Sequence, residues 1–142
     1  MAESRNQRPG GYQARQSGGD SDVQDADLRS IIHEGDAVKL NEIADRLGRY
    51  YASGGEREKL SASQIRGILD HLQRMYQFSQ TELQLLRPKL AYAAGRHGGK
   101  VLELQKVADK AIVLVEADEE RFKNFRNFFE AIVAYHRYHG GK

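Results

Sequence analysis

The sequence predicts an all-α protein, and three features of the chain support this class. Apolar residues recur every three or four positions from Val23 onward, which is the spacing of one face of a helix. No stretch alternates apolar and polar residues over the length of a strand. Glycine pairs and serines separate the periodic segments, where they end or begin helices. We therefore expect a compact bundle of five to six helices.

The chain divides into a tail and one domain. Residues 1–22 are rich in Gly, Ser, Gln and Arg and show no apolar periodicity. Such a segment buries too little apolar surface to offset the entropy lost on ordering. We predict a disordered N-terminal tail over residues 1–22 and a helical bundle domain over residues 23–142.

The first two helices of the domain are expected at about residues 25–33 and 37–52. Gly35 interrupts the pattern between them, and the run from Ser53 to Gly55 ends the second. The inward positions are Leu28, Ile31 and Ile32 in the first helix, and Val38, Leu40, Ile43, Ala44, Leu47 and Tyr51 in the second.

The next two helices are expected to begin at serine or threonine caps. Ser61 or Ser63 caps the third, and Ser79 or Thr81 begins the fourth. Pro88 should break or kink the fourth helix, because proline lacks a backbone donor and crowds the preceding turn. The inward positions are Ile65, Ile68, Leu69, Leu72 and Tyr76 in the third helix, and Leu83 and Leu86 in the fourth.

The last two helices are expected at about residues 100–116 and 118–139. Acidic residues open the final helix, where the helix dipole favours negative charge. Its apolar stripe is predicted to be core, and its width also suits contact with a partner chain. The stripe consists of Phe122, Phe125, Phe129, Ile132, Val133 and His136.

Composition narrows the possible functions. The chain has 30% charged residues, a net charge of +2 and no cysteine, so disulfides and thiol chemistry are excluded. No apolar run approaches the roughly 20 residues that span a bilayer, and no apolar signal core opens the chain. We expect a soluble, cytoplasmic protein.

Charge is segregated along the chain. Residues 59–100 hold seven basic and two acidic residues, residues 101–120 hold two basic and six acidic residues, and the chain then turns basic again. This pattern is compatible with one side that faces a polyanion and an acidic side that faces a basic neighbour, but charge alone does not favour it. Solvated helix faces with internal ion pairs are the alternative explanation.

No pattern of catalytic residues is evident. The glycine pairs lack the context of a phosphate-binding loop, and no serine lies in a nucleophile elbow. His136 and His139, with His97, are the candidates for a metal-dependent hydrolase, but a third ligand next to the helical pair is not evident. We predict a protein that is not an enzyme and has neither cofactor nor metal.

Cations on two adjacent helical segments are the strongest functional signal. Arg66 shares a polar face with Gln73 and Gln77, and Arg74 lies nearby. Lys89 and Arg96 are seven residues apart with Tyr92 between them, and Arg87 flanks Pro88. Cations on rigid helices bind phosphates without reading bases. The alternative is that Arg66 pairs with Asp70 and that Tyr92 is half-buried.

Three sequence runs carry a family resemblance. Residues 63–69 (SQIRGIL), 86–96 (LRPKLAYAAGR) and 128–138 (FFEAIVAYHRY) occur in this order in a chain of this size. Over about residues 25–140, the chain resembles the small subunit of type III-A (Csm) CRISPR interference complexes.

The resemblance implies a non-catalytic role in antiviral defence. Several copies would stack into an inner filament against the crRNA-bearing backbone subunit, in a complex that also holds the large subunit. They would contact the crRNA and target RNA through the backbone, without sequence preference. The matching motifs place Arg66, Arg87, Lys89 and Arg96 first as RNA contacts, with Tyr92 and Arg74 beside them. Arg121, Lys123, Arg126 and Arg137 form a second tier. The alternative function is a helical protein–protein scaffold subunit without direct RNA contact.

Overall fold

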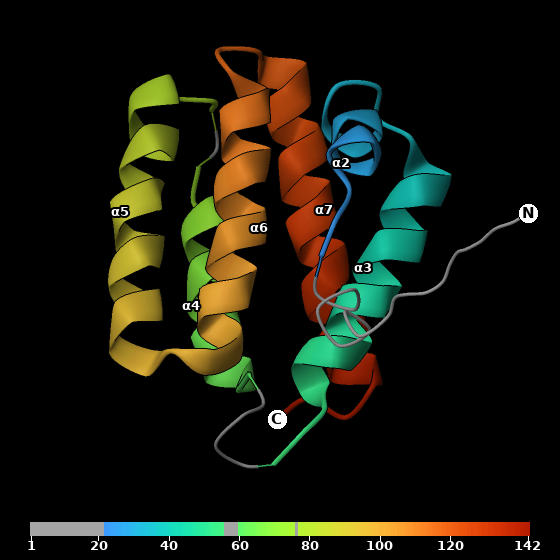
Figure 1. The fold of residues 1–142 in the computed structure, drawn as a ribbon. Helices are drawn as coiled ribbons and strands as arrows, with labels where there is room; N and C mark the ends of the chain where they lie inside the picture. The colour runs from blue at the N-terminus through green and yellow to red at the C-terminus, as the bar shows by residue number, and fades with distance from the viewer. Residues whose placement is uncertain (1–21, 56–59, 76) are drawn as a thin grey trace, which may run out of the picture.

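A computed structural model describes residues 22–55, 60–75 and 77–142, and these residues form six helices (Figure 1). In chain order they are α2 (Asp25–Ile32), α3 (Ala37–Ala52), α4 (Ala62–Gln73), α5 (Gln80–His97), α6 (Gly99–Val115) and α7 (Glu119–Tyr138). The all-α prediction is confirmed, and the described residues contain no strand. The predicted disordered tail, apart from Asp22, lies outside the described residues. No described helix has the length and hydropathy to cross a membrane.

The final helix, α7, lies at the centre of the bundle. It packs against α3, α4, α6 and α2, whereas α5 lies at the edge and packs mainly on α6 (Figure 1). The predicted aromatic stripe is core: Phe122, Phe125, Phe128 and Phe129 are each at most 2% exposed. The expectation that this stripe also serves a partner chain is wrong, because the protein's own helices cover it.

The closest helix packing, between α3 and α7, depends on Gly48. A Cβ atom at this position would lie 2.6 Å from the backbone nitrogen of His136 and 2.7 Å from the carbonyl carbon of Tyr135. Because real Cβ contacts are not this short, a larger residue would force the two helix backbones apart. Glycine at residue 48 therefore fixes the spacing of the two helices.

Four helices begin at side-chain caps. Asp36, Ser79 and Asp118 each accept a hydrogen bond from the backbone N–H three residues later. Ser61 forms a capping box with Gln64, in which each side chain accepts from the other residue's backbone N–H. The structure thus selects Ser61 over Ser63 and Ser79 over Thr81.

Three expectations about the helices are wrong. Pro88 does not break the fourth helix, since α5 runs from Gln80 to His97 through it, with buried leucines on both sides of the proline. Val38 is 79% exposed, because it lies about 140° around the helix from Ile43 at 3.6 residues per turn. The third helix ends at Gln73, so Gln77 is not on its polar face, and Tyr76 lies outside the described residues.

The C-terminal residues close the bundle beneath the start of α4. The carbonyl oxygen of Lys142 accepts a hydrogen bond of 2.9 Å from the backbone N–H of Ala62. The buried ring of His136 places Nε2 2.8 Å from the carbonyl oxygen of Leu60. These contacts hold the start of α4 against the end of α7, so the two helices run antiparallel (Figure 1).

Candidate nucleic-acid interface

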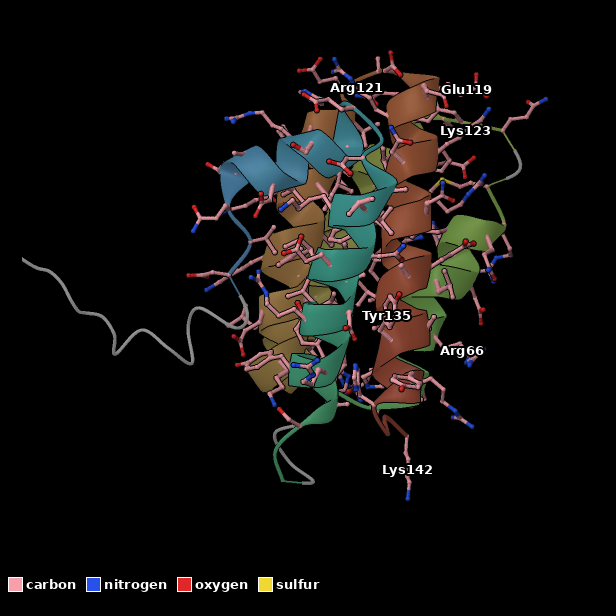
Figure 2. All side chains as sticks on the ribbon, turned by 90° about the vertical axis from the view of Figure 1, so that its right-hand side faces the viewer. Arg66, Glu119, Arg121, Lys123, Tyr135 and Lys142 are labelled. Atoms are coloured by element: carbon pink, nitrogen blue, oxygen red, sulfur yellow. The ribbon has the colours of Figure 1, made fainter. Side chains whose placement is uncertain are left out.

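Six exposed basic residues lie on or around α4, and we call them the cationic face. Arg66 projects from α4 and Lys123 from α7 on the same side of the molecule, and both point away from the bundle (Figure 2). Arg74 caps the C-terminus of α4. Helical spacing aligns Lys89 with Arg96 on α5, and Lys123 with Arg137 on α7. The cationic face is therefore Arg66, Arg74, Lys89, Arg96, Lys123 and Arg137, all exposed.

In the described part of the chain, the side chains of the cationic face have no internal partners. Within residues 22–55, 60–75 and 77–142, none of the six forms an ion pair or a side-chain hydrogen bond. The alternative pairing of Arg66 with Asp70 is therefore not formed. Cations that are already solvated and unpaired can meet an external anion without first breaking an internal contact.

The other three predicted arginines are engaged within the protein. Arg87 forms a bidentate ion pair with Asp109 of α6, at 2.6 and 3.1 Å. Arg121 pairs with Glu116 at 3.0 Å, at the end of the bundle where α7 begins (Figure 2). Arg126 donates to the carbonyl oxygen of Met75 at 3.2 Å, and its guanidinium lies 5.3 Å from the centre of the Phe122 ring.

Tyr92 lies on the outer surface of α5 with 69% of its area exposed. The alternative that it is half-buried is therefore wrong. It follows Lys89 by three residues and precedes Arg96 by four, so its ring lies beside both cations on the helix surface. An exposed aromatic ring among cations suits stacking against a nucleic-acid base.

A groove of about 280 Å³ runs between α4 and α5. His71 lies in it with Arg74 and Lys89, and its lining also includes Gln64, Gly67, Ile68, Leu86 and Leu90. Partial burial lowers the pKa of His71, and the positive charges of Lys89 and Arg74 lower it further, while Glu82 opposes them. The imidazole is therefore neutral near pH 7. The sequence pattern did not single out His71, because a histidine between apolar positions looks like an ordinary helix residue.

The carboxylates of residues 101–120 are largely used inside the protein. Glu103 accepts hydrogen bonds from the Tyr50 hydroxyl, and Asp109 and Glu116 pair with arginines. Asp118 caps α7. This leaves Glu119 and Glu120 exposed at the start of α7, so the support for an acidic docking side is weaker than the charge count indicated.

The three histidines of the metal hypothesis do not come together. His136 is buried against Leu60, His139 lies 2.6 Å from Asp45 of α3, and His97 ends α5. The described part of the chain contains no group of three or more His, Cys, Asp or Glu residues that could hold a metal ion.

The fold and the surface define a class: a small all-α protein whose described residues include unpaired, exposed cations on α4, α5 and α7. The family model Csm2 Type III-A matches residues 34–142, so the chain belongs to the Csm2 family of type III-A CRISPR complexes. It is thus a small subunit whose partners are other components of that complex. Comparison with curated proteins and with solved structures gives no match.

Proposed function

We propose that this subunit binds the backbone of guide and target RNA without sequence preference and has no catalytic activity of its own. It acts in antiviral defence as part of the inner filament of a cytoplasmic complex. Its partners are the crRNA and target RNA, the crRNA-bearing backbone subunit, the large subunit and further copies of itself. Sequence is read by base pairing between guide and target.

The observation that carries the proposal is the cationic face. Six long basic side chains project from three rigid helices, and none has an internal partner in the described structure. Lysine and arginine in this arrangement contact phosphate oxygens, which are the same for every sequence. Arg66, Arg74, Lys89 and Arg96 form the centre of the contact, with Tyr92 beside them, and Lys123 and Arg137 extend it along α7.

The three engaged arginines take other roles in this proposal. Arg87 holds α5 against α6, which keeps Lys89 and Arg96 on the outer side of the bundle. Arg121 and Arg126 stabilise the first half of α7 through Glu116 and through the Phe122 ring. They contribute to RNA binding by fixing the helices that carry the exposed cations.

Fluorescence anisotropy with two labelled RNAs of unrelated sequence tests the proposal at low salt. The triple variant Arg66→Ala, Lys89→Ala and Arg96→Ala should weaken binding to both RNAs equally. The matched control removes three exposed cations from α2 and α6, through Arg29→Ala, Lys106→Ala and Lys110→Ala, and should weaken binding much less. Absence of RNA binding by the unaltered protein would instead support the scaffold function.

A further inference from the structure

Resting on the proposed function, we propose that the groove between α4 and α5 is a subsite for one nucleotide of the RNA strand. Its phosphodiester lies between Arg74 and Lys89, next to His71, and its sugar lies against α4 at Gly67 and Ile68. The subsite makes RNA binding depend on pH through His71.

The dimensions and lining of the groove suit this ligand. Its volume of about 280 Å³ is close to the lower end of the range for small-ligand sites. Leu86 and Leu90 are buried and form an apolar floor, while Arg74 and Lys89 are exposed at its rim. A ribose with its phosphate offers C–H groups for contact with the leucines and an anionic end for the cations, which matches this division of the groove.

Gly67 leaves room for a ligand in the groove. It lies inside α4, where glycine is less favourable than alanine. A Cβ at this position would meet nothing within 4 Å, so packing inside the protein does not require glycine. Because glycine has no side chain, the backbone of α4 is open to the groove at residue 67. A ligand can approach a helix backbone closely only at such a position.

Protonation of the His71 ring is coupled to binding of the phosphodiester in the subsite. The surrounding charges are Arg74 of α4 and Lys89 and Glu82 of α5. Glu130 and Arg126 of α7, the other helix packed on α4, contact Gln73 and Met75 and do not line the groove. A phosphodiester between Arg74 and Lys89 brings negative charge to the imidazole and raises its pKa. Binding therefore takes up a proton, and affinity rises as pH falls.

The test measures RNA affinity by anisotropy from about pH 7.5 to about pH 6, where histidine titrates. The unaltered protein should bind about three- to tenfold more tightly at the lower pH, as uptake of up to one proton allows. His71→Gln should remove this dependence while leaving the other four histidines in place. An equal pH dependence in His71→Gln and the unaltered protein would overturn the coupling.

Gly67→Gln tests the groove itself. The long side chain should fill the groove and raise the dissociation constant for RNA about tenfold. The melting temperature of the variant should not fall. Gly95→Gln is the matched control, because Gly95 also lies inside a helix with nothing within 4 Å of its Cβ and does not line the groove. Normal RNA binding by Gly67→Gln would overturn the subsite and leave the cationic face standing. Absence of binding by the unaltered protein would refute the proposed function itself.

NMR titration of the His71 ring distinguishes a nucleotide from an anion alone. The full chain is titrated with a short oligouridylate and, separately, with inorganic phosphate at the same concentration of phosphate groups. The oligouridylate should raise the pKa of His71, and inorganic phosphate should raise it much less. Equal shifts would show a general anion site and overturn the assignment to a nucleotide.

Discussion

Arg87 and Asp109 join α5 to α6 through two parallel hydrogen bonds, from Nε to Oδ1 at 2.6 Å and from Nη2 to Oδ2 at 3.1 Å. The hydrogen bond to Asp109 is the main cause of a raised Arg87 pKa. Gln84 accepts a third hydrogen bond from the same guanidinium. Arg87, one of the four arginines and lysines that the sequence motifs placed first as RNA contacts, is therefore turned toward the protein.

Breaking the Arg87–Asp109 pair tests whether Arg87 positions α5 or contacts RNA directly. Asp109→Asn weakens the pair and frees the arginine, so the unfolding free energy should fall by about 1 kcal/mol, a value limited by solvent screening, and RNA affinity should not fall. Arg87→Met should cost similar stability. Urea unfolding and anisotropy check both variants, and weaker RNA binding by Arg87→Met without any loss of stability would show a direct contact instead.

The stability of the fold should be especially sensitive to the addition of a methyl group at Gly48. Gly48→Ala forces α3 away from α7 and should destabilise the fold by about 2 kcal/mol, within the range for overpacked cores. Gly67→Ala is the control, because its methyl group meets open space and should stabilise α4 by up to about 1 kcal/mol. Thermal unfolding of the two variants should therefore shift in opposite directions.

Lys100 is nearly buried and closes the C-terminal end of α3. Its Nζ donates to the carbonyl oxygens of Tyr50 and Ser53 at 2.9 and 2.6 Å, and to the Ser53 hydroxyl at 2.9 Å. Lys100→Met leaves these acceptors with fewer donors and should cost about 2 kcal/mol of unfolding free energy. Lys106→Met, at an exposed position of the same helix, should change stability little. Equal urea midpoints for the two variants would contradict this role.

His136 should make the fold sensitive to mild acid. Burial is the main cause of its lowered pKa, Arg137 lowers it further, and the hydrogen bond with Leu60 acts in the opposite direction. The unfolded chain therefore binds a proton more readily than the folded chain. The stabilising contribution of neutral His136 is present above the unfolded pKa of about 6.5 and is lost as pH falls toward the lower folded value.

Circular-dichroism melting between about pH 7.5 and about pH 5 checks this dependence. His136→Gln keeps a donor for the Leu60 carbonyl and removes the titrating group, so its melting temperature should fall less steeply with acid than that of the unaltered protein. His71→Gln removes the second histidine with a lowered pKa. Equal slopes for His136→Gln and the unaltered protein would contradict the assignment.

The sequence predicted the helices well because their signals are local. The caps at Ser61 and Ser79 and the aromatic stripe on α7 are each encoded within a few residues. The prediction that Val38 is buried was wrong, because the spacing of apolar residues does not show which edge of the apolar stripe meets the core. The break expected at Pro88 is not formed, because Leu83, Leu86 and Leu90 are buried on both sides of the proline. Such burial is a tertiary effect that the local sequence does not show.

The same limit applies to the candidate site. Arg66, Lys89 and Arg96 have the exposure that the spacing predicted, and their contact with RNA stays a prediction. Arg87 and Lys100 were counted as free charge, since their partners lie 22 and about 50 residues away in the chain. Charge counting cannot assign such partners, and it also cannot show that α4 and α5 leave a groove around His71.

The salt dependence of RNA affinity tests the central claim most directly. For single-stranded RNA, each phosphate contact contributes about 0.7 to the slope of log affinity against log salt concentration. The triple variant Arg66→Ala, Lys89→Ala and Arg96→Ala should therefore show a slope that is shallower by about 2 than that of the unaltered protein. An unchanged slope, with the variant folded, would contradict binding of RNA phosphates by the cationic face.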